Sequence, residues 1–513
     1  MSSDIPEWVT DAVFYQVFPD RLARSGRVPA PGRFEPWKAP PTSHGFKGGD
    51  LYGVIAHLDR LRSLGITALY LTPVFASASN HRYHTDDYFR VDPLLGGDAA
   101  LKELLDQAHA RDMRVVLDGV FNHCGRGFWP FHHVLENGAR SPYREWFHLD
   151  PDVLEGRRQL SAFPTMDELS RIGVLRSSGT PSGAASRAVL GYEAWWDLPA
   201  LPKLDLDEPH LRTLILDVAE HWLRFGIDGW RLDVAEEIGI DFWREFRTRV
   251  RSVRADAYLV AEIWRIEPQW LQGDTFDALM DYPLAEATIG FAAQHRLATG
   301  LDLPREYRDT LAPLDGASFW TRVEALRAAS CPAERSAQLN LLGSHDTPRL
   351  RTLCGGDRDA VRLAMLLQLT LPGTPCIYYG DEIGMEGLMD PDCRGAFPAE
   401  PRAWEAEPSG WLADLAALRH SSRALRDGEL TLLRAAGPAL AYLRRHDEDV
   451  FLCVANAGED PLRWTLDVPV ALAAVAGVPL RDAGAPSGHL LEDGTLAVEV
   501  PARQGGVLRL TPA

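Results

Sequence analysis

Four short segments carry acidic side chains directly after an apolar run typical of a buried β-strand. They are DGVFNH (118–123), GWRLDVAEE (229–237), AEIW (261–264) and GSHDTPR (343–349). A single aspartate at a strand end is commonly a turn residue or a helix cap. Four such segments, with an arginine and two histidines beside the carboxylates, are hard to explain as caps. They indicate a site of acid–base chemistry.

Several carboxylates without an obvious metal cluster suit the cleavage of a glycosidic bond. The transition state resembles an oxocarbenium ion, one carboxylate must be ionised, and another must be protonated to donate to the leaving oxygen. Arg231 and Asp233 alternate onto one face of a predicted strand. We therefore expect the guanidinium to hold Asp233 ionised. Glu262 lies among apolar residues and Trp264, so we expect its pKa to be the raised one.

Positioning these groups requires strands that end on one face of a sheet. Apolar runs predict strands at 12–18, 66–72, 114–120, 229–234, 258–263, 278–282, 338–343 and 376–379. Longer amphipathic patterns predict helices at 51–64, 99–111, 209–225, 241–253 and 358–371. This alternation predicts the α/β class and a parallel sheet closed as a (β/α)8 TIM barrel, with active groups at the C-terminal strand ends. An open doubly wound sheet is the alternative, but no G-x-G-x-x-G follows the first strand.

Two regions depart from the alternation and predict further domains. The connection after the third strand is too long for a simple loop, so we predict an inserted domain B at 123–205 between barrel segments 1–122 and 206–424. Its EAWWDLPALP stretch contains Trp195 and Trp196, which we expect to anchor the insertion on the barrel. Stacking on sugar rings is the alternative. Alternating sequence after Leu425 predicts a C-terminal antiparallel β-sandwich at 425–513.

Composition restricts the class of partner and the compartment. The chain has 513 residues, 46% of them hydrophobic, and a formal net charge of −19. Such acidity disfavours nucleic acid and anionic membranes as partners. The sequence has no run of apolar residues long enough for a membrane span and no secretory signal pattern. Six scattered cysteines predict free thiols, and we expect a cytoplasmic protein.

The four acidic segments resemble, in order and spacing, four sequence regions of the α-amylase family of glycoside hydrolases (family 13). LPKLD (201–205) resembles a fifth short motif of that family. VFYQVFPDR, GFKGGDLYGV and GTPCIYYGDEIGMEGLMDPDCR are similar to the cyclomaltodextrinase, neopullulanase and maltogenic amylase branch. The resemblance covers roughly residues 8–400 and implies the same barrel fold.

The resemblance implies a role for each candidate residue. Asp233 would be the nucleophile, Glu262 the general acid and base, and Asp346 a stabiliser of the distorted sugar. Tyr83 would stack under the sugar ring, and Asp390 with Arg394 would hold the next sugar. The full set of implied substrate-binding residues is Tyr83, His123, Arg231, His345, Trp264, Asp390 and Arg394. Ordinary packing of the tyrosine and histidines, and a surface ion pair for Asp390 and Arg394, remain the alternatives.

Departures from the family pattern change some expectations. Calcium-dependent α-amylases have a histidine where this chain has Glu237, so we expect no calcium at that family site and no required cofactor. The similar branch usually has asparagine where Glu236 stands, which leaves the acceptor preference open. Trp8 lies almost at the first predicted strand. We therefore expect the branch's N-terminal β-domain to be absent.

The resulting expectation is a retaining hydrolase of α-1,4-glucosidic bonds in cyclodextrins, maltooligosaccharides or related α-glucans. An exo-acting α-glucosidase or a glucosyl-transferring isomerase, acting on maltose, sucrose or trehalose, is the alternative. A non-catalytic scaffold is disfavoured because Asp233, Glu262 and Asp346 are all present. The expected partner is an α-glucan oligosaccharide. The sequence leaves the oligomeric state and the balance of hydrolysis and transfer open.

Overall fold

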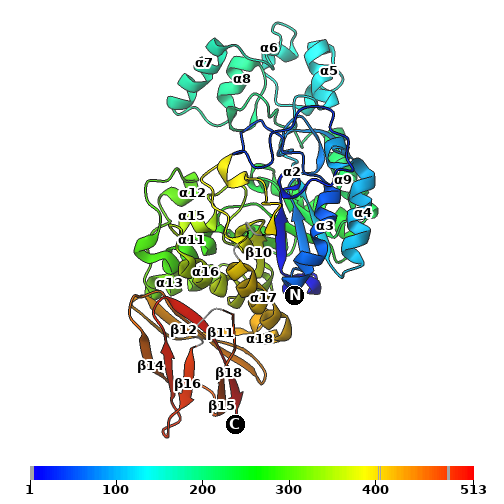
Figure 1. Cartoon of the computed structure of the whole chain (residues 1–513). Helices are drawn as coiled ribbons and strands as arrows, with labels where there is room; N and C mark the ends of the chain where they lie inside the picture. Colours follow the sequence, from blue (N-terminus) through cyan, green and yellow to red (C-terminus); the bar gives the residue numbers. More distant parts are fainter. Residues whose placement is uncertain (1–4, 402–403, 405, 482–485) are drawn as a thin grey trace.

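Eight parallel strands form a barrel in the computed structural model, which describes residues 5–401, 404, 406–481 and 486–513. The barrel lies in the middle of the molecule (Figure 1). The order around the barrel is β8-β7-β6-β5-β2-β1-β10-β9, and a parallel bridge from Met280 to Leu339 joins its two ends. The strands are β1 (Phe14–Val17), β2 (Ala68–Leu71), β5 (Arg114–Gly119), β6 (Gly229–Leu232), β7 (Tyr258–Ala261), β8 (Ala278–Leu279), β9 (Leu339–Leu341) and β10 (Thr374–Tyr378). All eight predicted strands and the TIM barrel are confirmed, and the open-sheet alternative is wrong.

Side chains of each barrel strand alternate between the interior and the surrounding helices. Phe14, Tyr70 and Val116 belong to the core inside the barrel. Their neighbours Leu69 and Val115 pack in the outer core. Because both faces are covered, the strands read as almost continuous apolar runs. Arg231 and Asp118 are the exceptions that carry charge into the interior.

The helices that surround the barrel begin at residues with a physical reason to start a helix. Asp50 accepts a hydrogen bond from Gly53 N at the start of α3, and Asp357 caps α16 through Ala360 N. Pro209 stands at the first turn of α9. The main helices are α3 (Leu51–Ser63), α4 (Gly97–His109), α9 (Pro209–Phe225), α10 (Ile240–Val253), α11 (Tyr282–Ala293), α13 (Gly316–Ala328), α16 (Arg358–Thr370) and α17 (Ala406–Ser421). The five predicted helices are confirmed.

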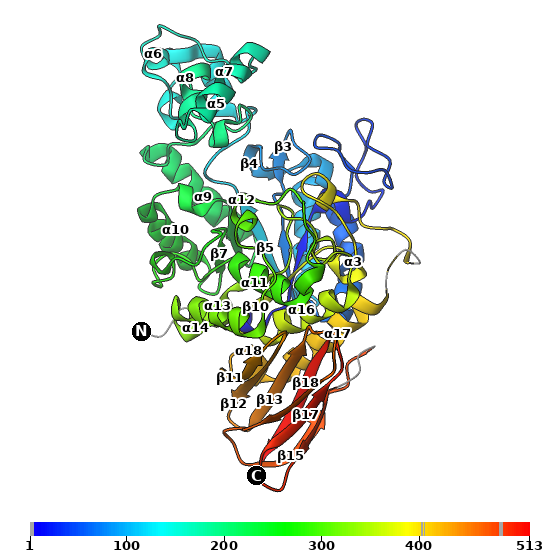
Figure 2. The ribbon, with the colours of Figure 1, turned by 90° about the vertical axis from the view of Figure 1, so that its left-hand side faces the viewer.

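The long connection after β5 carries helices of its own. They are α5 (Trp129–Asn137), α6 (Pro151–Leu154), α7 (Met166–Ser177) and α8 (Ala184–Leu190). These helices lie at one end of the molecule and the C-terminal strands at the other (Figures 1 and 2). Antiparallel bridges such as His123 to Lys203 connect the two ends of the connection. The boundaries 123–205 themselves stay a prediction.

A two-stranded hairpin after β2 was not predicted. β3 (Phe75–Ser77) pairs antiparallel with β4 (Thr85–Val91). The loop between these strands contains Tyr83. The hairpin therefore brings a predicted site residue over the barrel from a connection for which no element was predicted.

Two antiparallel sheets form the C-terminal region, as predicted. One sheet has the order β11-β12-β13-β18-β15 and the other β14-β17-β16. Leu443, Leu452 and Leu508 of the first sheet share an apolar core with Leu496 and Val498 of the second. The strands are β11 (Glu429–Ala436), β12 (Ala439–His446), β13 (Asp449–Asn456), β14 (Leu462–Leu466), β15 (Leu472–Gly477), β16 (Ser487–Leu490), β17 (Leu496–Val500) and β18 (Gln504–Pro512).

The structure also bears on the expectations about cysteines and membrane spans. All six cysteines are free, as predicted. Within the described part of the chain, no helix has both the length and the apolar character that crossing a bilayer requires.

Candidate active site

A fully buried arginine joins three carboxylates at the C-terminal ends of β5, β6 and β7. Arg231 is directly opposite Asp118 on the neighbouring strand, and its Nη1 is 2.8 Å from Asp118 Oδ1. The same Nη1 is 2.8 Å from Asp233 Oδ1, and Nη2 is 2.8 Å from Glu262 Oε2. The side chain of Arg231 is 0% exposed, against 7% for Asp233 and 6% for Glu262. The charges in the interior are therefore paired, and two of the carboxylates lie just beyond the strand ends.

Asp118 is held more completely than the other two carboxylates. Its Oδ2 accepts hydrogen bonds from Tyr70 Oη at 2.7 Å and from Tyr83 Oη at 2.8 Å. Arg231 also contacts both of its oxygens. Asp118 thus fixes the guanidinium and has little capacity left for a ligand.

Glu262 is positioned by two further donors. The backbone N–H of Val234 donates to Oε2 at 3.1 Å, and Nε1 of Trp264 donates to Oε1 at 3.3 Å. Val234 has φ 38° and ψ 49°, which is a rare conformation for a β-branched residue and is commonly retained at functional sites. Trp264 is itself stacked on Tyr282, with ring centroids 3.7 Å apart. The Glu262 carboxylate is therefore aimed by backbone geometry and by a stacked aromatic pair.

The pKa of Asp233 differs from the expectation drawn from the sequence. Burial raises the pKa of Asp233 well above its ordinary value, and repulsion by Glu262 and Asp118 adds to this, while Arg231 acts in the opposite direction. Burial likewise raises the pKa of Asp118. The expectation that Arg231 simply holds Asp233 ionised is wrong for the free site, because one positive charge is shared by three buried carboxylates. Such a coupled group readily retains a proton.

A second set of polar residues faces the three carboxylates. Asp346 accepts from Arg394 Nη2 at 3.0 Å, and Arg394 Nη1 lies 3.1 Å from Asp390 Oδ2. Arg394 Nε also donates to the backbone oxygen of His345 at 2.8 Å. Asp346 is 32% exposed and Asp390 is 43% exposed. These carboxylates are consequently more open to solvent than Asp233 and Glu262.

The protonation of His345 follows from its neighbours. Gln16 Nε2 lies 2.9 Å from His345 Nδ1 and donates to it, so the ring proton is on Nε2, which is 3.1 Å from Asp346 Oδ2. Burial, with repulsion from Arg394 and Arg231, lowers the pKa of His345 well below its usual range. His345 is therefore neutral and presents a donor to Asp346.

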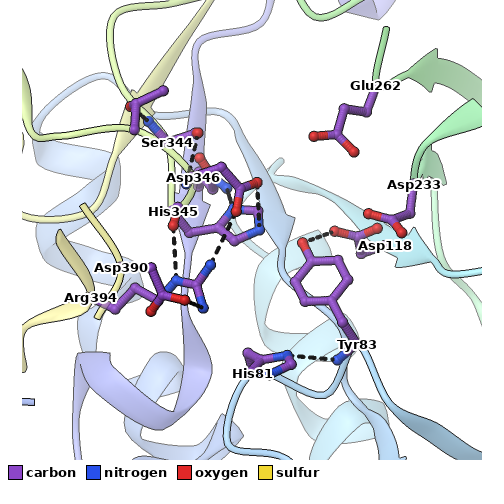
Figure 3. A network of polar contacts seen from close by, with 12 residues as sticks. His81, Tyr83, Asp118, Asp233, Glu262, Ser344, His345, Asp346, Asp390 and Arg394 are labelled. Carbon is purple, nitrogen blue, oxygen red and sulfur yellow. Dashed lines mark hydrogen bonds and ion pairs between the residues drawn. The ribbon is translucent and has the colours of Figure 1, made fainter. Parts of the chain in front are cut away.

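Tyr83 lies between the two sets of residues. Its ring is parallel to that of His345, with centroids 5.2 Å apart and 9° between the planes, while its hydroxyl reaches Asp118. Asp233 and Glu262 point toward Asp346 from the opposite side of a common space (Figure 3). Segments that are distant in sequence thus converge on one site.

His123 is buried at the edge of the site and has an unpaired nitrogen. Among the described residues, none forms a hydrogen bond with His123 Nε2. Burial lowers the pKa of His123 to about 3, which keeps the ring neutral near neutral pH. Its ring stacks on Trp195, with centroids 4.9 Å apart. Trp195 therefore packs on the residue at which the predicted insertion begins, four positions after the end of β5.

Trp196 does not follow the same expectation. Its side chain is 55% exposed, and its ring stacks on Trp195 with ring centroids 4.8 Å apart. Anchoring was predicted for both tryptophans and is wrong for Trp196, because its backbone turns the side chain toward solvent.

Three residues that support the site were not among the predicted site residues. Tyr282 donates to Ser344 Oγ at 3.3 Å, and Ser344 Oγ accepts from Asp346 N at 3.1 Å. Together with its stacking on Trp264, Tyr282 connects the Glu262 side to the Asp346 side. Gln16 fixes the His345 tautomer. Tyr282 ends the predicted strand 278–282 and Ser344 directly follows the predicted strand 338–343, so the strand-end rule applied to acidic residues could have found both. Gln16 lies within the predicted strand 12–18, so that rule does not reach it.

Glu237 stands where calcium-dependent α-amylases have a histidine that helps to hold calcium. Glu237 forms an ion pair with Lys203 at 3.0 Å. Across the described residues, no three His, Cys, Asp or Glu side chains form a group that could hold a metal ion. The expectation of no calcium stays a prediction.

Comparisons with known proteins agree with the geometry. Residues 16–411 match the family described as "Alpha amylase, catalytic domain". A cyclomaltodextrinase of Geobacillus thermopakistaniensis is 41% identical over 89% of this chain and 70% of its own length. The crystal structure of Ttha1563 from Thermus thermophilus is similar with a TM-score of 0.86 at 42% identity, over 98% of this chain and 99% of that one. A debranching enzyme from Nostoc punctiforme has a TM-score of 0.84 at 41% identity, over 99% and 100% of the two chains.

Proposed function

The chain belongs to the α-amylase family of glycoside hydrolases, and from this we propose that it cleaves α-glucosidic bonds with retention of configuration. The observation that carries the proposal is the arrangement of Asp233 and Glu262 on one guanidinium, with Asp346 across the site. Retaining enzymes need their two carboxyl groups about 5–5.5 Å apart. Two carboxylates that share one guanidinium are held near each other, which supports this class of mechanism.

In the proposed mechanism, Asp233 attacks the anomeric carbon and forms a glycosyl-enzyme bond. Glu262 donates its proton to the glycosidic oxygen, so the leaving sugar departs as an alcohol. Glu262 then takes a proton from water, which attacks the anomeric carbon and releases Asp233. Three ionised carboxylates and one guanidinium would carry two excess negative charges. Retaining one proton removes half of this excess. In the reactive form of the site this proton would be on Glu262, which donates it in the first step, while Asp233 would be ionised beside Arg231.

The remaining residues would bind and distort the sugar. Asp346 would accept hydrogen bonds from ring hydroxyls, and its bonds to Arg394 and neutral His345 orient it. The free Nε2 of His123 would bond another hydroxyl. Tyr83 would contact the ring face, and Arg394 with Asp390 would hold the neighbouring sugar. Trp264 would contact the leaving part while it aims Glu262.

The proposed substrates are cyclodextrins and maltooligosaccharides. This is supported by relatives named cyclomaltodextrinase and by one named neopullulanase 2 from Thermoactinomyces vulgaris, which is 40% identical over 88% of this chain. We also propose that no metal ion is needed, since every step uses protein groups and Glu237 is paired with Lys203. A cytoplasmic location is proposed from the free thiols and from a 34% identical relative named "Intracellular maltogenic amylase".

α-1,6 linkages form a second candidate target. Structural relatives of nearly the same length are named as a debranching enzyme and as a cyclic α-maltosyl-(1→6)-maltose hydrolase. Pullulan distinguishes the two linkages because α-1,4 cleavage yields panose or isopanose, whereas α-1,6 cleavage yields maltotriose.

A substrate panel tests the proposal. Purified protein, before and after dialysis against EDTA, is incubated with cyclodextrins, starch, pullulan, maltose, sucrose and trehalose. We expect maltose and glucose from cyclodextrin, with the α-anomer appearing first by NMR, and no effect of EDTA. Glucose alone or an isomerised disaccharide would favour the exo-acting or isomerase alternative. A first-formed β-anomer would refute retention.

A further inference from the structure

A stack of aromatic rings leads from the catalytic site to the surface of the inserted segment. The ring centroids of His123 and Trp195 are 4.9 Å apart, with 11° between the ring planes. Those of Trp195 and Trp196 are 4.8 Å apart, with 15° between the planes. His123 is buried, Trp195 is half-buried, and Trp196 is exposed. The outer face of the stack is thus an indole that is supported from beneath and open to solvent.

The backbone that presents Trp196 is in an unusual conformation. Trp196 has φ 53° and the next residue, Asp197, has φ 56°, so two consecutive non-glycine residues are left-handed. Such conformations are disfavoured and persist only when the surroundings impose them, commonly at functional sites. A simple anchor for the insertion would not require this strain.

Contacts from α8 hold the strained turn in place. Asp197 is buried, and its Oδ1 accepts from Ser186 N at 2.7 Å. The Ser186 hydroxyl in turn accepts from Ala194 N at 2.9 Å on the other side of the two tryptophans. One serine therefore fixes both ends of the turn, and Trp196 is exposed on a rigid support.

Exposure alone does not distinguish Trp196 from another exposed tryptophan of this protein. Trp129 on α5 is 61% exposed, but it has helical backbone. Among the described residues, its ring forms aromatic contacts only with His132 and His133 of the same helix. Single exposed apolar side chains are ordinary in soluble proteins. Trp196 differs because strain, a pinned turn and a continuous stack to His123 occur together.

We propose that Trp196, supported by Trp195, is a platform for a glucose ring of the substrate beyond those at the carboxylates. This rests on the proposed function, since the ligand is a longer segment of the same α-glucan chain. The C–H face of a glucose ring is apolar and flat enough to cover an indole, and aromatic contact of this kind adds affinity without fixing linkage chemistry. The platform makes the enzyme more efficient on long chains than on short ones.

Substrates of different length test the platform. We compare kcat/KM for maltotriose and maltoheptaose in the wild type, W196A, W196F and the matched surface control W129A. In W196A, the maltoheptaose-to-maltotriose ratio of kcat/KM should fall roughly threefold to tenfold. W196F keeps a flat ring and should restore most of the ratio, and W129A should leave the ratio unchanged.

Binding without turnover separates this proposal from the proposed function. Maltoheptaose is titrated calorimetrically into E262Q and into the E262Q/W196A double variant, and the double variant should bind more weakly by a similar factor. Equal affinity, or equal losses of kcat/KM on both substrates with a lowered Tm, would show that Trp196 only supports the turn and would overturn the platform. Wild-type protein that binds maltoheptaose through Trp196 but cleaves no α-glucan would instead overturn the proposed function.

Discussion

The two sides of the active site differ in how their charges meet solvent. Asp233 and Glu262 are at most 7% exposed and share the buried guanidinium of Arg231. Asp346 and Asp390 are 32% and 43% exposed and are paired with Arg394 at the rim. Burial strengthens electrostatic interactions and shifts protonation, whereas exposed ion pairs are weakened by water. The buried side is built to move a proton, and the rim side is built to bind hydroxyls.

This difference predicts which kinetic parameter each residue controls. Interactions that are made only in the transition state change kcat, while those made equally in the ground state change KM. Substitutions of Glu262 or Arg231 should therefore act on kcat, and a substitution of Asp390 should act on KM.

The largest effect is expected for the carboxylates that carry the reaction. Glu262→Gln keeps the shape of the side chain but cannot donate its proton, and kcat should fall by about 10²- to 10⁴-fold with little change in affinity. Steady-state kinetics on β-cyclodextrin and titration of the inactive variant measure the two quantities. Unchanged turnover would exclude Glu262 as the acid.

Arg231→Lys should have the next largest effect. Lysine keeps the positive charge but cannot reach three carboxylates through a planar fork. We expect kcat to fall by roughly 10- to 100-fold, with a lowered Tm because a buried ion network is broken. The comparison would be contradicted if Arg231→Lys raised KM and left kcat unchanged.

A smaller effect is expected at the rim. Asp390 is 43% exposed, and its Oδ2 is paired with Arg394. Asp390→Ala should raise KM for maltooligosaccharides about threefold to tenfold and change kcat by less than about twofold. A fall in kcat comparable to that of Glu262→Gln would remove the distinction between the two sides.

The smallest effect is on stability and depends on pH. The pKa of Asp233 is raised in the folded protein, mainly by burial, so the folded state binds its proton more tightly than the unfolded chain does. Its stabilising contribution is present below the unfolded pKa and is lost as pH rises through the raised folded pKa. Asp233→Asn removes the buried charge, so its Tm should exceed that of the wild type by more at about pH 8 than at about pH 4. Calorimetry at both values measures this difference, and an opposite trend would refute the raised pKa.

The barrel and the chemical residues were predictable because they depend on local patterns. Apolar runs buried on both faces identified every barrel strand, and amphipathic patterns identified five of the helices around them. The acidic segments at strand ends then converged as expected, because parallel strands bring their C-terminal ends to one face. The family motifs identified the same residues independently.

Other features depend on contacts between distant segments and could not be predicted. The β3–β4 hairpin positions Tyr83 between Asp118 and His345, yet its strands lack a strong pattern. Trp195 and Trp196 are neighbours with the same side chain, and only the left-handed turn pinned by Ser186 makes one half-buried and the other exposed.

The sequence by itself determined which residues could do acid–base chemistry and that parallel strands would gather them at one end of a barrel. Only the tertiary structure decided how they share charge: three buried carboxylates meet on Arg231, and the pKa of Asp233 is raised rather than lowered. The physical reason is that side-chain periodicity is encoded locally, whereas desolvation and Coulomb interactions depend on every group that folding brings within a few ångströms.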